Sequence, residues 1–191
     1  MAAVKYRRRI DAAGDDPYDA EAWRGLFRAI AGGRVEALER LYDLAAGRVY
    51  GLAAWRLGSA EDAADVTHDV FVRVAESADR LREVDDPRAW LLAVTHRLAV
   101  DHARRRRRHR TTPLEDHVFF EVDVSHRVER IAVTAVLARL PDKQREAIFL
   151  HHFAGCTFAE VGRITGVPTF TAASRYRLGL NKLRAILEGE S

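Results

Sequence analysis

The side chains in this sequence best suited to specific chemistry are the cations near its C-terminal end, and their chemistry is the binding of a polyanion. Residues 161–187 contain no Asp or Glu, but they include Arg163, Arg175, Arg177, Lys182 and Arg184. Cations without carboxylates nearby attract phosphates, and small polar side chains between them allow a helix to enter the major groove of DNA. A solvated helical surface is the alternative, but the length of the acid-free stretch favours DNA binding.

Two helices joined by a tight turn are expected to position these cations. Thr157 and Glu160 form a capping-box pattern that starts a short helix over 157–164, Gly166-Val167-Pro168 makes the turn, and a longer helix follows over 168–187. The helical period predicts an inward stripe of Tyr176, Leu180, Leu183 and Leu187. It predicts an outward face of Thr171, Ser174, Arg175, Leu178, Asn181 and Lys182. This order of elements is typical of a helix-turn-helix.

A second group of cations lies at the end of a helix expected from 87 to about 108. Asp86 is a suitable N-cap, and Pro87 suits the first helical position. Trp90, Leu91, Val94 and Leu98 are expected to face inward, while Arg97, Arg104 and Arg108 share one side at i, i+7 and i+11. This side either contacts nucleic acid or is a solvated helix end favoured by the helix dipole.

Acidic residues form a stripe on a third predicted helix, from about 60 to 78. Asp62, Asp65 and Asp69 fall at i, i+3 and i+7, so they lie on the same face. The stripe is suited to a basic protein surface, or it keeps the domain soluble.

The sequence offers no pattern that indicates an enzyme, a metal site or a cofactor. Cys156 is the sole cysteine, which excludes an internal disulfide and a Cys-based zinc site. His68-Asp69, Asp101-His102 and His151-His152 are isolated dyads, and there is no glycine-rich phosphate loop. No stretch is apolar for long enough to span a bilayer, and the basic start has no apolar segment after it. These features predict a cytoplasmic protein without catalytic residues.

The periodicity predicts an all-α protein of two small helical domains joined by a flexible linker. The first domain is expected over 18–108, with helices at 18–30, 34–57, 60–78 and 87–108. The linker is expected over 109–124, where the helical period is lost. The second domain is expected over 125–187, with helices at 125–140, 142–153, 157–164 and 168–187.

Four stretches, taken in order, resemble the extracytoplasmic-function (ECF) branch of the sigma-70 family of bacterial RNA polymerase. EALERLYDLAAGRVYGLAAWRL resembles the opening helices of that family, and AEDAADVTHDVFVRV resembles its polymerase-clamp-binding helix. RAWLLAVTHRLAVDHARRRRR resembles its −10 helix, and LARLPDKQREAIFLHHFAGCTFAEVGRITGVP resembles its −35-binding domain up to the recognition helix. The resemblance implies a sigma factor that binds core RNA polymerase and directs promoter recognition, DNA melting and initiation.

The resemblance also implies roles for individual residues. The surface that binds core polymerase would comprise Asp62, Asp65, Val66, Asp69 and Val70. The −10 DNA-binding residues would be Arg88, Trp90, His96, Arg97, Arg104, Arg105 and Arg108. The −35 DNA-binding residues would be Thr169, Thr171, Ser174, Arg175, Arg177 and Lys182. An anti-sigma factor is a further partner that is typical of the family.

The recognition helix departs from the family pattern, and two other functions compete with the sigma-factor interpretation. Thr169-Phe170 stands where Glu-Gly is usual, and Leu178 suits either a thymine methyl group or a regulatory protein. A helix-turn-helix regulator that does not act as an initiation subunit explains 125–187, but it leaves the arginine-tipped helix and the acidic stripe unexplained. A small helical hydrolase with a His/Asp pair explains none of the helix-turn-helix.

Overall fold

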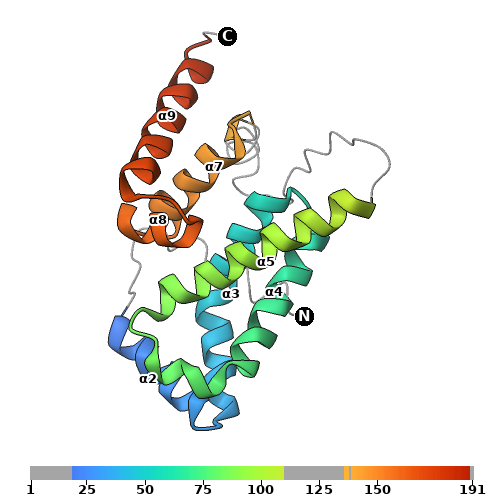
Figure 1. Ribbon diagram of the computed structural model, residues 1–191, viewed down its shortest axis with the longest axis vertical. Helices are drawn as coiled ribbons and strands as arrows, with labels where there is room; N and C mark the ends of the chain where they lie inside the picture. Colours follow the sequence, from blue (N-terminus) through green and yellow to red (C-terminus); the bar gives the residue numbers. More distant parts are fainter. Residues whose placement is uncertain (1–18, 110–135, 138, 190–191) are drawn as a thin grey trace, which may run out of the picture.

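A computed structural model describes residues 19–109, 136–137 and 139–189, and every regular element in these ranges is helical (Figure 1). The all-α prediction is therefore confirmed. Most of the predicted linker, residues 110–124, and most of the predicted helix over 125–140 lie outside the described residues. The elements of the N-terminal unit are α2 (Ala20–Ala31), α3 (Val35–Leu57), α4 (Ala60–Glu76), the 3₁₀ helix η2 (Ala78–Glu83) and α5 (Pro87–His109). Those of the C-terminal unit are α7 (Asp142–Ile148), the π-helical turn η4 (Phe149–Phe153), α8 (Phe158–Thr165) and α9 (Thr169–Leu187).

Side chains that cap the first turns explain where several helices begin. The Ser59 side chain accepts a hydrogen bond from the backbone N–H of Asp62 at 3.2 Å, and Asp86 accepts one from Ala89 at 3.0 Å. Thr157 and Glu160 form the complete, reciprocal capping box that their spacing predicts. Caps of this kind satisfy amide groups that have no partner within the helix, so they fix helix starts to within a residue or two.

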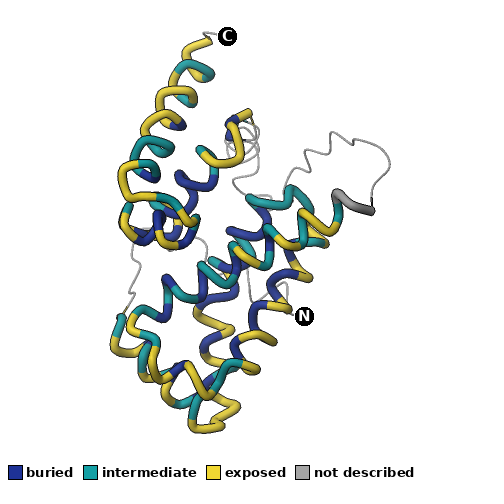
Figure 2. Tube along the Cα trace, viewed as in Figure 1, coloured by how far each residue is buried: buried dark blue, intermediate teal, exposed yellow. Residues whose placement is uncertain are grey.

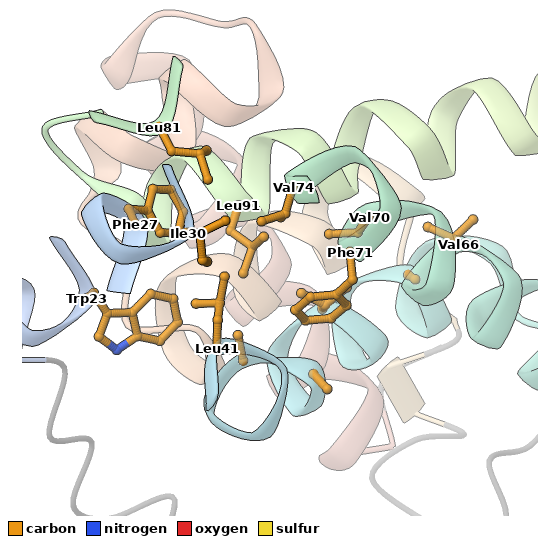
Figure 3. Close-up of a cluster of buried hydrophobic side chains, with 14 of the residues drawn as sticks. Trp23, Phe27, Ile30, Leu41, Val66, Val70, Phe71, Val74, Leu81 and Leu91 are labelled. Atoms are coloured by element: carbon orange, nitrogen blue, oxygen red, sulfur yellow. The ribbon is translucent and has the colours of Figure 1, made fainter. Parts of the chain in front are cut away.

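One continuous core holds the N-terminal unit together. Its helices bring Leu41, Val70 and Leu91 together (Figure 3), and Val49 belongs to the same cluster of almost fully buried side chains. The buried stretches of these helices face one another in Figure 2. Phe27 packs edge-on against Trp90, with ring centroids 5.7 Å apart. Burial of a large aliphatic or aromatic side chain contributes about 1.5–3 kcal/mol, so this cluster accounts for the stability of the four-helix unit.

The C-terminal unit builds its core partly from residues of the N-terminal unit. Leu150, Val161 and Ala172 pack with Leu52 of α3 and Leu92 of α5, and both leucines are fully buried there. The indole of Trp55 lies 5.1 Å from the ring of Phe149. The two units therefore share a hydrophobic cluster and sit against each other through α3, α5, α7 and α8.

Helix α9 differs from its predicted orientation. Leu180 and Leu187, expected inside, are 41% and 72% exposed, whereas Ala172 and Gly179 are buried. A Cβ atom at Gly179 would lie 2.8 Å from the Ile148 side chain, so glycine allows α7 to approach closely at this point. Leu183 and Ile186, further along the helix, still pack against the cluster of Leu137, Leu140 and Ile148. The buried line of α9 therefore continues to its last turns (Figure 1), and Leu180 and Leu187 lie to one side of it.

Candidate nucleic-acid and protein interfaces

Helix α4 presents part of the predicted acidic surface to solvent. Asp65 and Asp69 are exposed, as their spacing predicts. Val66 and Val70 are 1% and 0% exposed and belong to the core of the N-terminal unit. The expectation that these valines contact a partner is therefore corrected: they anchor the helix that presents the two acids.

Asp62, the first acid of the predicted stripe, is engaged within the fold. One carboxylate oxygen lies 2.9 Å from His102 Nε2, and the other forms a close ion pair with Arg106. Burial by itself would raise the pKa of Asp62, but the hydrogen bonds and charges of His102 and Arg106 outweigh it and the pKa is lowered. The prediction for Asp62 is corrected accordingly, because its carboxylate ties the start of α4 to the last turns of α5.

The outer side of α5 exposes the cations that the sequence indicated. Arg97, Arg104 and Arg105 are exposed, and Arg104 lies 3.7 Å from Asp101. The side chain of Arg108 lies outside the described residues. Between α4 and α5 is an open hollow of about 630 Å³, with Val72 and Leu98 among its lining residues. Asp69 lines the same hollow as Arg104 and Arg105, so exposed charges of both signs meet there.

The C-terminal unit covers two other predicted DNA contacts on α5. Arg88 lies 3.5 Å from Glu160, with both side chains 11% exposed, and His96 Nε2 lies 3.1 Å from Glu146. Trp90 packs against Phe27 and is half-buried, so part of its role is in the core. In this arrangement Arg88 and His96 face carboxylates of the C-terminal unit, and their assignment to −10 DNA stays a prediction.

Close packing accompanies these ion pairs. A Cβ atom at Gly51 of α3 would lie 2.9 Å from Cζ of Phe149, so the ring rests directly against the helix backbone. Trp55 also lies 5.4 Å from the ring of Phe153. The contact between the units thus combines apolar packing with the shielded Arg88–Glu160 ion pair and the close approach of His96 to Glu146.

The residues of the recognition helix α9 that are predicted to contact DNA differ in their exposure. Thr169, Arg177 and Lys182 are exposed, whereas Thr171, Ser174 and Arg175 are half-buried. Ala172 and Gly179 form the buried line of the helix, and residues near 170, 174, 177 and 181 lie opposite to it at about 100° per residue. Arg177 therefore lies near the centre of the outward face, whereas the half-buried Arg175 lies nearer to the buried line.

The remaining reactive side chains serve structural purposes. Burial raises the pKa of the Cys156 thiol to about 12, so the thiolate is scarce at neutral pH. His151 Nδ1 lies 2.7 Å from the Cys156 carbonyl oxygen, and its ring stacks on Phe158. Within the described residues, no group of three or more His, Cys, Asp or Glu could hold a metal ion. None of the helices described is both long enough and apolar enough to cross a membrane.

Sequence reasoning missed the residues that act through distant partners. Glu160 pairs with Arg88 of α5, Glu146 lies beside His96, and Asp62 pairs with side chains some forty residues away. The capping-box pattern indicates that Glu160 caps α8, but the contact of Glu160 with Arg88 depends on how the two units pack. No periodicity within a single helix indicates such pairs.

Comparison with known proteins gives concordant matches along the chain. The family model for Sigma-70 region 2 matches residues 41–109, and that for Sigma-70, region 4 matches residues 130–183. The ECF RNA polymerase sigma factor SigK of Mycobacterium sp. (strain KMS) is 32% identical over 173 residues, covering 85% of this chain and 89% of the relative. SigK of Mycobacterium ulcerans (strain Agy99) is 32% identical over 181 residues, covering 90% and 97%.

Two solved structures share the fold. CnrH, in complex with the cytosolic domain of CnrY, has a TM-score of 0.63 at 24% identity and covers 88% of this chain and 98% of its own. The sigma factor RpoE of Bartonella quintana, in complex with the anti-sigma factor NepR, has a TM-score of 0.64 at 19% identity. It covers 82% of this chain and 100% of its own.

Proposed function

Because this chain belongs to the extracytoplasmic-function sigma factors of the sigma-70 family, we propose which of its surfaces bind core RNA polymerase and which bind each promoter element. As a sigma factor, the chain binds the core enzyme and directs it to promoters, where DNA melts and transcription starts. The polymerase performs the chemistry, and this chain contributes binding surfaces in the cytoplasm. We assign 18–108 to core and −10 binding, 109–124 to the linker and 125–187 to −35 binding.

The exposed acids of α4 are assigned to core polymerase. Asp65 and Asp69 lie one helical turn apart on a helix that buried valines hold rigid. Carboxylates fixed on a rigid helix suit a basic surface, because electrostatic complementarity accelerates association and sets the register of the complex. The adjacent hollow between α4 and α5 extends this surface towards the cations of α5.

The exposed cations of α5 are assigned to the −10 element. Arg97, Arg104 and Arg105 point away from the core, while Asp62 neutralises Arg106. Guanidinium groups on one helix side suit phosphates of a strand that separates from its complement. The observation that carries the whole proposal is the placement of three exposed groups of side chains: Asp65 and Asp69 on α4, the arginines at 97, 104 and 105 on α5, and the cations of the acid-free α9.

Full promoter engagement requires the two units to move apart. Glu160 and Glu146 stand beside Arg88 and His96, where DNA phosphates would bind if these side chains contact the −10 region. Binding to core polymerase would exchange these internal pairs for contacts with DNA. We therefore expect the distance between fluorophores on the two units to increase when core polymerase is added.

An inhibitory protein partner is also part of the proposal. RpoE, which shares the fold, is known in complex with the anti-sigma factor NepR. A protein that holds the two units together would keep Arg88 and His96 covered. Co-purification of such a protein with the full chain, and its release on addition of core polymerase, would support this role.

The decisive experiment is transcription by core RNA polymerase reconstituted with the full chain on fragments of genomic DNA. We expect run-off transcripts from defined start sites that are absent without the chain. Arg104→Ala with Arg105→Ala should lose permanganate reactivity at the −10 thymines, because these exposed cations would hold the opened strand. Arg106→Ala is the matched control, since Arg106 is already paired with Asp62, and it should retain strand opening.

Two outcomes would contradict parts of the proposal. Sequence-specific DNA binding by the chain without any initiation from core polymerase would favour the regulator alternative. Normal strand opening by the Arg104/Arg105 variant would identify those arginines as a solvated helix end and remove the −10 assignment from them.

A further inference from the structure

Phe170 is an exposed aromatic side chain at the start of the recognition helix. It is 78% exposed, more than any other large apolar residue in the described part of the chain. It belongs to none of the hydrophobic clusters formed by the described residues, and their ring-to-ring contacts do not include it. The fold therefore gains little from an aromatic ring at this position.

The position of Phe170 on α9 places it at the centre of the outward face. At about 100° per residue, Phe170 lies opposite the buried Ala172 and Gly179. Arg177 and Asn181, both exposed, share its side of the helix. Phe170 is thus an apolar group within a face that is otherwise suited to phosphates and base edges.

A face of this composition can recognise a particular base. In helix-turn-helix proteins, residues near the N-terminus of the second helix contact base edges in the major groove. Thymine presents a C5-methyl group there, and an apolar side chain such as Phe can contact it, whereas polar groups serve the other edges. As the second residue of α9, Phe170 lies where such a contact is made.

We propose that Phe170 is a specificity-determining residue that recognises the 5-methyl group of a thymine in the −35 element. The inference rests on the proposed role of α9 in −35 binding and names one base feature that this helix reads. Arg177 and Asn181 supply polar contacts beside the ring, and the absence of acids over 161–187 leaves the approach to DNA unopposed. Loss of the ring should therefore change sequence preference more than it changes overall affinity.

The test uses holoenzyme made from core RNA polymerase and the full chain. Duplexes with a randomised −35 region are selected for binding, and each thymine of the selected element is then replaced singly by deoxyuridine, which lacks the methyl group. We expect deoxyuridine at one or two positions to weaken binding of the unmodified protein about fourfold, the loss expected for one buried methyl group. Phe170→Ala should bind the thymine and deoxyuridine duplexes equally.

A control on the same helix separates this contact from a general effect of apolar surface. Leu187 is also highly exposed but lies at the far end of α9, so Leu187→Ala should keep the full preference for thymine. Both substitutions remove exposed side chains and should leave the thermal midpoint nearly unchanged.

Four results would overturn the inference. A selected element without thymine would do so, as would a deoxyuridine penalty that persists in Phe170→Ala. If Phe170→Ala instead weakens binding of the chain to core polymerase with its thymine preference intact, the ring contacts protein. Selection of no −35 sequence at all by the unmodified holoenzyme would refute the −35 assignment of α9 itself, and the inference with it.

Discussion

The N-terminal and C-terminal units differ in how they complete their cores. Helices α2 to α5 enclose a cluster made entirely of their own side chains, with Leu41, Val49 and Val70 at its centre. Helices α7 to α9 enclose a smaller cluster that also requires Leu52 and Leu92 from the first unit. We therefore expect the N-terminal unit to fold independently, whereas the C-terminal unit gains part of its stability from being docked.

Truncation of a leucine in the N-terminal core should have the largest effect. Leu41 is fully buried, and Leu41→Ala should lower the free energy of unfolding by about 2–5 kcal/mol, through lost burial and the cavity left behind. Urea denaturation followed by circular dichroism measures this change. Because a domain is typically stable by about 5–15 kcal/mol, the variant should be close to unfolding. A change below about 1 kcal/mol would show that this core is not the main source of stability.

Charge reversal on α4 should have the next largest effect, but on binding rather than folding. Asp65→Arg with Asp69→Arg should weaken binding to core polymerase at least a hundredfold, because two exposed attractive contacts become repulsive ones. Affinity is measured by fluorescence anisotropy with labelled core enzyme, and the thermal midpoint is measured alongside it. Glu61→Arg, at an exposed acid near the start of the same helix, is the control for altered charge. Undiminished affinity of the double variant would remove α4 from the polymerase interface.

Truncation of Leu92, an α5 leucine that packs in the core of the C-terminal unit, tests whether the N-terminal unit folds without docking. Leu92 is as buried as Leu41, but it packs in the cluster of the C-terminal unit. Leu92→Ala should weaken docking about tenfold or more and leave the N-terminal unit folded. Energy transfer between fluorophores on the two units reports docking, while circular dichroism reports helix content. Loss of N-terminal helices in step with docking would show that the first unit does not stand alone.

The two arginines of α9 should differ in how they affect DNA binding. Arg177 lies on the outward face, whereas Arg175 is half-buried and lies nearer to the buried line, so Arg177→Ala should relax preference at one −35 position at a cost of about 1–3 kcal/mol. Arg175→Ala should weaken all sequences alike and reduce the salt slope by about one unit. Binding of a set of single-base variants at several salt concentrations measures both effects. Identical profiles for the two variants would refute this division.

The smallest effect is expected from acid titration of Asp62. Its folded pKa lies below the ordinary value of 3.8, so its ion pairs contribute stability above that value and lose it as the pH falls through the folded pKa. Asp62→Asn should therefore be less stable than the unmodified chain at pH 6, and the difference should shrink below about pH 4. Urea midpoints between pH 6 and pH 2.5 test this. Asp65→Asn controls for removal of an acid from the same helix, and a difference constant with pH would contradict the assignment.

Features encoded locally could be predicted, and features that depend on packing between units could not. Helix starts followed from Ser59, Asp86 and Thr157, because a cap acts on backbone groups only a few residues away. The exposure of Asp65 and Asp69 followed from helical spacing. By contrast, the docking of Leu52 and Leu92 into the second unit depends on contacts between distant segments. Leu180 and Leu187 were misplaced for the same reason, since a helical wheel does not show that the neighbouring segments pack against Gly179, Leu183 and Ile186 instead.

Gly51 is the position at which a single methyl group would shift the proposed balance between docked and separated units. Glycine within a helix is about 1 kcal/mol less favourable than alanine, yet a methyl group here would press on the ring of Phe149. Alanine at this position would strengthen α3 in both populations while penalising the docked one alone. A chain with Gly51→Ala should thus resist heat better as a separated unit and spend less time docked. If the units separate on binding core polymerase as proposed, a substitution at this one position would change how much of the protein is already separated beforehand.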